Sequence, residues 1–418
     1  MTSTRTLCAT ALLGLLVGCA AESAAVAYTG ATLWDGTGAA AVTGATLVVD
    51  GGRVIAVGAD VEPPRGATLV PLDGKFVIPG LVDAHAHVTG AWAPEEITDP
   101  VDRVRGDLLL FARYGVTSVN SLGDDAPTLA ARDAATATDA RARIQVSGPV
   151  IAATDAAGAR AAALTNIDSG VDWLKLRVDD ELGATEKMPW EAVTAVTEAA
   201  RERGLRVATH LFYLEDAKRL LELGTGLLAH SVRNTDVDVA FLDQLRASGV
   251  CYVPTLVREV STFVYAERPD WFDDPFFVAH ANPGEVARAS DPAFMTNMRE
   301  SPAAAAYRLA LVQAQRNLKS VSDAGIPIAF GTDAGPAARF PGYFEHMELQ
   351  LMVDAGLTPA QALESATRVA AECVGMDGVG TLAPGNWADF LVLGADPLSD
   401  ISATHRLEQV YIGGVLVP

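Results

Sequence analysis

The sequence predicts an α/β protein built on a parallel TIM (β/α)8 barrel, with a small β-sandwich domain formed by the N- and C-terminal segments. Between 79 and 383, short apolar runs alternate with helical patterns. The segments at 27–78 and 384–418 contain only short strand patterns and turns. With 418 residues and 50% hydrophobic content, the chain is long enough for a barrel of about 250 residues and an appendage.

The first predicted strands lie between 27 and 78, where apolar runs alternate with turns that contain glycine. Asp50, Gly51 and Gly52 separate two apolar runs, which is a hairpin signal. The same kind of pattern returns at 388–393 and 410–415. We therefore expect both ends of the chain to share one sandwich domain.

Eight apolar runs of strand length predict the barrel strands, near 80–84, 116–121, 143–148, 172–177, 205–210, 226–230, 250–256 and 326–332. Helical patterns fill the intervals at 101–114, 190–203, 214–223, 236–248 and 302–323. A further helix follows the barrel, with Thr358 as N-cap and Pro359 at the first helical position. Eight parallel strands separated by helices can close into a barrel.

One connection is much longer than the others. The insertion at about 257–300 carries seven aromatic residues, which are Phe263, Tyr265, Trp271, Phe272, Phe276, Phe277 and Phe294. It lies on the side of the barrel where active-site loops grow. We interpret it as a lid or pocket wall; an aromatic-stabilised helical excursion and a dimer contact are the alternatives.

Metal-competent residues lie at the ends of the predicted strands. His85 and His87 form a His-x-His pair after an apolar run, and alternate residues of a strand point the same way. Further candidates at or within strand ends are Lys175, His210, His230 and Asp333. Two histidines in an ordinary turn would be the alternative for the pair alone. Because chemistry in parallel α/β folds lies at the carboxyl ends of strands, the set predicts a metal site there.

Lys175 lies inside a predicted barrel strand, where an ammonium group without a partner costs several kcal/mol or loses its proton. A neutral lysine can add CO2 and become a carbamate, which is an anionic ligand able to bridge two metal ions. The alternative is an ion-paired Lys175 inside the barrel.

The order His-x-His, Lys, His, His, Asp resembles that of the amidohydrolase superfamily, from about Ala27 to the C-terminus. The strings GLVDAHAH, VDWLKL, AHSV, GTDAG and LAPGNWADFLVL resemble its imidazolonepropionase-like and prolidase-like (Xaa-Pro dipeptidase-like) branch. The resemblance implies one metal ion on His85, His87 and Asp333, a second on His210 and His230, and carboxylated Lys175 with a hydroxide between them.

The same resemblance implies a hydrolase with two divalent metal ions, and zinc suits the imidazole and carboxylate ligands. Asp333 would also act as general acid/base. We expect a dipeptidase that cleaves an amide bond next to a free carboxylate in a small-molecule substrate. A one-metal hydrolase of cyclic amides, similar to imidazolonepropionase, is a second interpretation, against which Lys175 argues. A catalytically silent lipoprotein that binds a solute is a third.

Two residues are candidates for substrate binding. Arg177 shares a strand face with Lys175, and a planar guanidinium group there suits a carboxylate. Tyr213, three residues after His210, is the second candidate. Ordinary packing or solvation at the rim is the alternative for both. The remaining histidines have no strand-end pattern and receive no role; they are His280, His346 and His405.

The N-terminus has the pattern of an export signal. Arg5 precedes an apolar stretch at 7–17, which has the length of a signal-peptide core. The string LVGC at 16–19 resembles a bacterial lipobox, so 1–18 would be a signal peptide and Cys19 would carry lipid. An ordinary secreted signal, cut a few residues later, is the alternative. Both interpretations export the protein, and the first anchors it by lipid in the cell envelope or periplasm.

Charge and cysteine content set further bounds. A formal net charge of −21, without a basic stripe, argues against nucleic acid or an anionic membrane surface as a partner. A homo-oligomer remains open. Cys251 and Cys373 lie in apolar contexts, so we expect two buried thiols, with a disulfide as the alternative.

Overall fold

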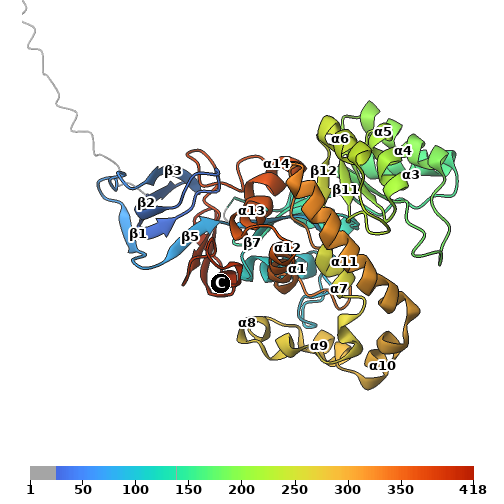
Figure 1. The fold of residues 1–418 in the computed structure, drawn as a ribbon. Coiled ribbons are helices and arrows are strands. Elements are labelled where there is room, and N and C mark those ends of the chain that lie inside the picture. The colour runs from blue at the N-terminus through green and yellow to red at the C-terminus, as the bar shows by residue number, and fades with distance from the viewer. Residues whose placement is uncertain (1–24, 138) are drawn as a thin grey trace, which may run out of the picture.

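The computed structural model describes residues 25–137 and 139–418, so the predicted signal peptide at 1–18 and the lipidation site at Cys19 lie outside the described residues. A lobe rich in β-strands lies at one end of the molecule, and a larger α/β body follows it (Figure 1). Helices α8, α9 and α10 project from that body (Figure 1). Within the described residues, no helix has the length and apolarity needed to span a bilayer.

Strands from both ends of the chain form one eight-stranded sheet. Seven of them follow in the order β15 (Val415–Leu416), β14 (Leu407–Ile412), β13 (Phe390–Leu393), β5 (Phe76–Pro79), β1 (Val26–Leu33), β2 (Val42–Asp50) and β3 (Arg53–Gly58), while β4 (Thr68–Pro71) pairs with β1. The pairing of β13 with β5 joins strands from the two ends of the chain. The strands make a single sheet, so the pairing does not establish the two layers of the predicted sandwich.

Local sequence and packing explain this sheet. The predicted hairpin joins β2 to β3, where Asp50 pairs with Arg53, and Gly51 and Gly52 have φ of 56° and 79°. Two successive positive φ angles are typical of a tight hairpin turn, and glycine adopts them without strain. Aromatic rings then hold the two chain ends together, because Tyr28 lies 4.9 Å from Phe390, centroid to centroid.

The central strands form two parallel sheets. The first contains β6 (Leu81–Ala86), β7 (Val116–Ser121) and β8 (Arg143–Val146), and the second contains β9 (Trp173–Arg177), β10 (Arg206–His210), β11 (Leu227–Ala229) and β12 (Cys251–Val253). An isolated bridge between Ile151 and Leu176 joins the sheets at one side. Seven predicted barrel strands are therefore present, and each pairs in parallel with its neighbour.

The eighth predicted strand, at 326–332, is not a regular strand. It has one isolated bridge, between Ile328 and Tyr252, and Phe330 accepts a backbone hydrogen bond of 2.9 Å from Ala84. Pro327 lacks the N–H group that a strand would donate at this position. The ring of strands is thus not one continuous closed sheet at this point.

Helices cover the central strands and begin and end at predictable residues. Those of the body are α1 (Pro100–Arg113), α2 (Ala126–Asp133), α3 (Ala156–Asp168), α4 (Trp190–Glu202), α5 (Leu214–Leu223), α6 (Val239–Ser248), α11 (Pro302–Asp323), α12 (Tyr343–Asp354), α13 (Pro359–Glu364) and α14 (Ala370–Val374). Thr358 caps α13 in a capping box with Gln361, which confirms the predicted start. Gly224 and Gly249 end α5 and α6 in the left-handed conformation.

The insertion at 257–300 is a helical excursion stabilised by aromatic packing. Its helices are α7 (Leu256–Val260), α8 (Pro275–Val278), α9 (Pro283–Ala289) and α10 (Pro292–Glu300), with short 3-10 turns at Val264–Ala266 and Asp270–Asp273. Trp271 packs on Phe277 and Tyr343 at centroid distances of 4.8 and 5.1 Å. The hydroxyl group of Tyr265 donates to the Ala338 carbonyl oxygen, and that of Tyr114 donates to the Phe277 carbonyl oxygen. The excursion is therefore fastened to the body.

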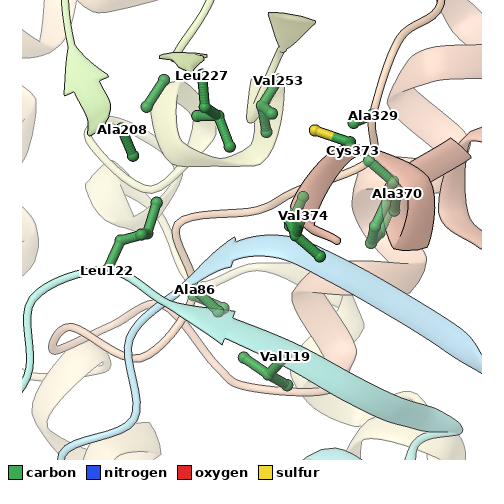
Figure 2. Close-up of a cluster of buried hydrophobic side chains, with 14 of the residues drawn as sticks. Ala86, Val119, Leu122, Ala208, Leu227, Val253, Ala329, Ala370, Cys373 and Val374 are labelled. Carbon is green, nitrogen blue, oxygen red and sulfur yellow. The ribbon is translucent and has the colours of Figure 1, made fainter. Parts of the chain in front are cut away.

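The expectation of two buried thiols is wrong: Cys251 of β12 and Cys373 of α14 form a disulfide across 122 residues. Their Cα atoms lie 5.7 Å apart, a separation that a disulfide can span. Figure 2 shows Cys373 and Val374 on the side of α14 that faces the buried side chains of the barrel, including Val253 and Ala329. The packing of α14 brings the cysteines together, and sequence spacing does not reveal it.

Candidate metal centre

Metal-competent side chains converge where the central strands end. Suitable ligand atoms of His85, His230 and Asp333 all lie within 4.8 Å of one another, and the three residues are buried. Three more predicted residues are attached to this group: His87 Nε2 lies 2.7 Å from Asp333 Oδ1, Lys175 Nζ 3.1 Å from His85 Nε2, and His210 Nδ1 2.8 Å from His230 Nε2. All six predicted metal-site residues thus belong to one continuous cluster.

Two cluster residues have unusual backbone conformations. His230 has φ of 75° and Asp333 has φ of 60°, in the left-handed region that non-glycine residues rarely adopt. The Asp333 amide donates a hydrogen bond of 2.7 Å to the His85 carbonyl oxygen, which holds this turn in place. Strain of this kind, of order 1–3 kcal/mol per residue, is concentrated at functional sites.

Close approach of the backbone explains two glycines around Asp333. A Cβ atom on Gly331 would lie 3.0 Å from the His85 amide nitrogen, and one on Gly335 would overlap the His87 carbonyl oxygen. The segment that carries Asp333 therefore packs directly on the one that carries the His-x-His pair. Glycine is required at both positions.

The buried histidines are neutral near pH 7. Burial lowers the pKa of His85 and of His210 to about 3, and it lowers the pKa of His230 well below the ordinary value. A neutral imidazole keeps the lone pair that a metal ion needs. Burial works against ionisation of Asp333, but Arg339 and the bonds from His85 and His87 hold its pKa well below the usual range.

Lys175 is 3% exposed, and burial lowers its pKa to about 8. Among the described residues, the hydrogen-bond partner of its amine is His85, and Asp333 raises the pKa only through its charge. Within the part of the chain that the structure describes, Lys175 thus does not form the ion pair that was the alternative to a carbamate. A pKa near 8 makes the neutral amine accessible at physiological pH.

Three supporting residues escaped sequence analysis. Asp179 lies 2.9 Å from His210 Nε2, and Thr255 lies 2.6 Å from His230 Nδ1. Asp83 accepts a hydrogen bond from the His85 amide, and burial raises its pKa to about 7. A period of two along 83, 85 and 87 was a usable signal for Asp83. Asp179 and Thr255 follow their strands in loops, where periodicity gives no signal.

The predicted substrate-binding residues have other partners. Arg177, at the end of β9, forms an ion pair with Glu181, and its side chain is 34% exposed. The Tyr213 hydroxyl donates to Asp180. His346 is buried away from the cluster, between Thr404 and the Tyr114 carbonyl oxygen.

An α/β fold with histidine, aspartate and lysine side chains gathered at strand ends defines a class of metal-dependent hydrolases. The sequence profile of the amidohydrolase family matches residues 76–417, so the chain belongs to this family. Imidazolonepropionase of Deinococcus radiodurans is 25% identical over 398 residues, which cover 88% of this chain and 91% of that protein.

Solved structures share the fold. A Xaa-Pro dipeptidase with bound methionine in its active site aligns with a TM-score of 0.75 at 23% identity, over 94% of this chain and 99% of that one. Molinate hydrolase aligns with a TM-score of 0.72 at 20% identity, over 94% and 95% of the two chains. Members of the family are TIM barrels, which agrees with the mixed α/β body.

The described residues fit a metal ion. Neutral imidazole nitrogens and a carboxylate oxygen form the donor set of His85, His230 and Asp333, and such donors suit zinc and similar divalent ions. His85 Nδ1 is also buried without a hydrogen-bond partner among the described residues. The cluster can therefore hold at least one ion.

Proposed function

We propose that this chain is a metal-dependent hydrolase of amide bonds, and specifically a dipeptidase that acts next to a free carboxylate. The observation that carries the proposal is the position of Lys175, a buried amine with a lowered pKa that is attached to the histidine cluster. A mononuclear site has no need of such a residue. A carbamate on Lys175 would give the cluster the anionic bridge of a binuclear site.

In this proposal His85, His87 and Asp333 hold one ion. His210 and His230 would hold the other, and carboxylated Lys175 would be a further ligand. Zinc is the ion that the donor set favours. When bound, the two ions supply Lewis acidity at the scissile carbonyl group and lower the pKa of the attacking water.

The protein's own residues position and move the proton. Asp333 is ionised near pH 7 because Arg339 and the two histidines stabilise its charge, so it can accept a proton from the attacking water. It then passes this proton to the departing amine nitrogen. Asp179 and Thr255 hold the rings of His210 and His230 in place through their hydrogen bonds.

A second candidate is a one-metal hydrolase of cyclic amides. It is supported by the 25% identity to an imidazolonepropionase over most of both chains. This candidate uses the same histidines and Asp333, but it leaves Lys175 without a chemical role.

The deciding experiment combines metal analysis with substrate profiling on one preparation. We expect two equivalents of zinc per chain, a carboxylated Lys175 in a metal-bound crystal structure, and hydrolysis of dipeptides. One equivalent of metal with hydrolysis of cyclic amides would favour the second candidate. A preparation that binds metal but hydrolyses neither class would overturn the dipeptidase proposal.

We also propose that the protein is exported and anchored by lipid on Cys19. The string LVGC at 16–19 motivates this proposal. The disulfide between Cys251 and Cys373 supports export, because such bonds persist mainly in oxidising compartments.

A further inference from the structure

Two buried arginine side chains and a third, partly buried one lie on one side of the metal centre. Arg233 follows β11, Arg258 lies in α7, and Arg339 follows Asp333 along the chain. Arg233 is 2% exposed and Arg258 is 7% exposed. None of the three was singled out by sequence analysis, because each lies beyond a strand, in a helix or loop.

Two carboxylates contact these arginines, and the arginines share them unequally. Glu259 lies 2.9 Å from Arg233 Nε and 3.1 Å from Arg258 Nη1. Asp333 Oδ2 forms an ion pair with Arg339 and lies 4.0 Å from Arg258 Nε, which is too long for a hydrogen bond. The negative charge of Asp179 also acts to raise the pKa of Arg233. Glu259 is therefore shared by Arg233 and Arg258, whereas Asp333 is the main partner of Arg339 and a more distant one of Arg258.

Asp333 is also the candidate metal ligand. A carboxylate that binds a metal ion has less charge to offer to Arg258 and Arg339. Arg258 then keeps only Glu259, which it shares with Arg233, so a further anion beside Arg258 and Arg339 would offset the remaining positive charge.

The hydrogen bonds of Arg258 indicate where that anion belongs. Its Nη1 atom is held by Glu259, and its guanidinium lies 4.7 Å from the centre of the Tyr307 ring. Its Nε atom is buried and has no hydrogen-bond partner among the described residues. Arg339 is oriented by a hydrogen bond of 3.1 Å from its Nε to Ser261. Buried donors are normally satisfied, so the open Nε position indicates an acceptor supplied by a ligand.

We propose that Arg258 and Arg339 form the subsite for the substrate's carboxylate, on the departing side of the scissile amide. The inference rests on the proposed dipeptidase and adds to it the residues that would bind the free carboxyl group of a dipeptide or of another N-acyl amino acid. Planar guanidinium groups bind carboxylates through paired hydrogen bonds. This proposal assigns to Arg258 and Arg339 the carboxylate binding that the sequence predicted for Arg177. Arg177 itself is paired with Glu181 at the rim.

The test uses a library of L-alanyl dipeptides, each as the free acid and as the C-terminal amide, with the metal-loaded enzyme. We expect Arg258→Met to lower kcat/KM about 10- to 100-fold for acids and to change it little for amides. Arg258→Lys, which keeps the charge but not the planar fork, should fall between the two. Arg339→Met should lower kcat/KM for both classes, because Arg339 also stabilises the charge of Asp333, and lower it further for acids. The ratio of kcat/KM for acid and amide therefore keeps the proposal testable if Arg258→Met fails to fold.

Arg268→Met is the matched control. Arg268 lies on the same excursion, is largely exposed and pairs with Asp273, so its loss should leave both substrate classes unaffected. Arg177→Met tests the competing assignment. Equal losses on acids and amides in the Arg258 and Arg339 variants would overturn the proposal. An acid-selective loss in Arg177→Met alone would overturn it as well.

A binding measurement separates this proposal from the proposed function. N-acetyl-L-proline and N-acetyl-L-prolinamide are titrated into the metal-loaded protein by calorimetry. We expect the acid to bind at least 10-fold more tightly than the amide, and this preference to vanish in Arg258→Met at unchanged metal content. If the wild type hydrolyses no library member but keeps the preference, the dipeptidase proposal fails and the anion subsite stands. If acid and amide bind equally, the subsite proposal fails, whatever the enzyme hydrolyses.

Discussion

The carboxylate of Asp179 lies 2.9 Å from Nε2 of His210. Nδ1 of the same ring lies 2.8 Å from Nε2 of His230, so the two ring nitrogens of His210 face different partners. An ionised Asp179 accepts a hydrogen bond from the Nε2–H group, which fixes the tautomer and leaves the lone pair of Nδ1 directed at the centre. Hydrogen bonding to His210 also offsets the effect of burial and holds the pKa of Asp179 at about 2, so this acceptor stays charged.

The first prediction follows from this contact. Asp179→Leu should weaken metal binding about 10- to 100-fold, because the ring of His210 loses the acceptor that orients it. Asp179→Asn keeps the shape and should have a smaller effect. Competition with a chromogenic chelator measures both affinities. Metal affinity equal to wild type in the leucine variant would remove Asp179 from its positioning role.

The second prediction concerns Lys175. Lys175→Met should lose hydrolysis and most of the bound metal, yet stabilise the metal-free protein. Burial lowers the pKa of Lys175 to about 8 in the folded state, so the unfolded chain, with a pKa near 10.5, binds the proton more tightly. The wild-type free energy of unfolding should therefore rise with pH between about 8 and 10.5, and the variant should lack this rise.

Urea denaturation of the metal-free proteins at pH 7 and pH 10 tests whether the free energy of unfolding rises with pH in the wild type and not in the variant. A gain of about 1–3 kcal/mol at pH 7 is expected for the variant. A fully active Lys175→Met enzyme with two metal ions would exclude Lys175 as a metal ligand.

The third prediction concerns Asp333. Asp333→Asn should retain part of the metal, because His85, His87 and His230 remain, but kcat should fall by about 100-fold or more since the proton acceptor is lost. Steady-state kinetics at saturating metal separates this effect from weaker metal binding. Asp323→Asn, at the exposed end of α11, serves as the control and should behave like the wild type. An unchanged kcat in Asp333→Asn would exclude the general acid/base role.

The fourth prediction concerns the disulfide. Replacing Cys251 and Cys373 together by serine should lower the free energy of unfolding by about 2–5 kcal/mol, since the bond closes a long loop of the unfolded chain. The initial kcat should stay close to that of the wild type, because neither cysteine contacts the metal cluster. Thermal unfolding with and without a reductant gives the same comparison in the wild type. Identical stability under both conditions would show that the bond does not contribute.

The fifth prediction concerns export. Labelled palmitate should be incorporated into the wild-type protein, which should fractionate with membranes, whereas Cys19→Ser should remain unlabelled. Soluble, unlabelled protein in both cases would favour the ordinary secreted signal.

Much of the centre could be predicted because its residues follow a short-range rule. His85, His210 and His230 each end an apolar run, and parallel strands bring such ends together. The alternation of side chains along a strand likewise placed His87 with His85. Their convergence in the structure agrees with that rule, while the roles of individual ligands remain proposals.

The parts that could not be predicted depend on long-range packing. Cys373 meets Cys251 only because α14 packs beside β12, 122 residues away in the sequence. Arg258 lies in the short helix α7 and Arg339 in a loop, and the packing of these segments on the body, which no short-range repeat reveals, sets the direction of both side chains. Pro327 shows the opposite case: its missing N–H group was visible in the sequence, but its effect on strand pairing appears only in three dimensions.

The tethering of the excursion has a consequence for how fast substrates bind. Tyr265 and Tyr114 fix it to the body through their hydroxyl groups, and α7 of the same segment carries Arg258. A substrate therefore meets a surface that is already assembled at the moment of encounter. The observed association rate should rise linearly with substrate concentration, without the plateau that a slow closing step imposes. Differences in affinity between substrates should then lie mainly in their dissociation rate constants and less in their association rate constants.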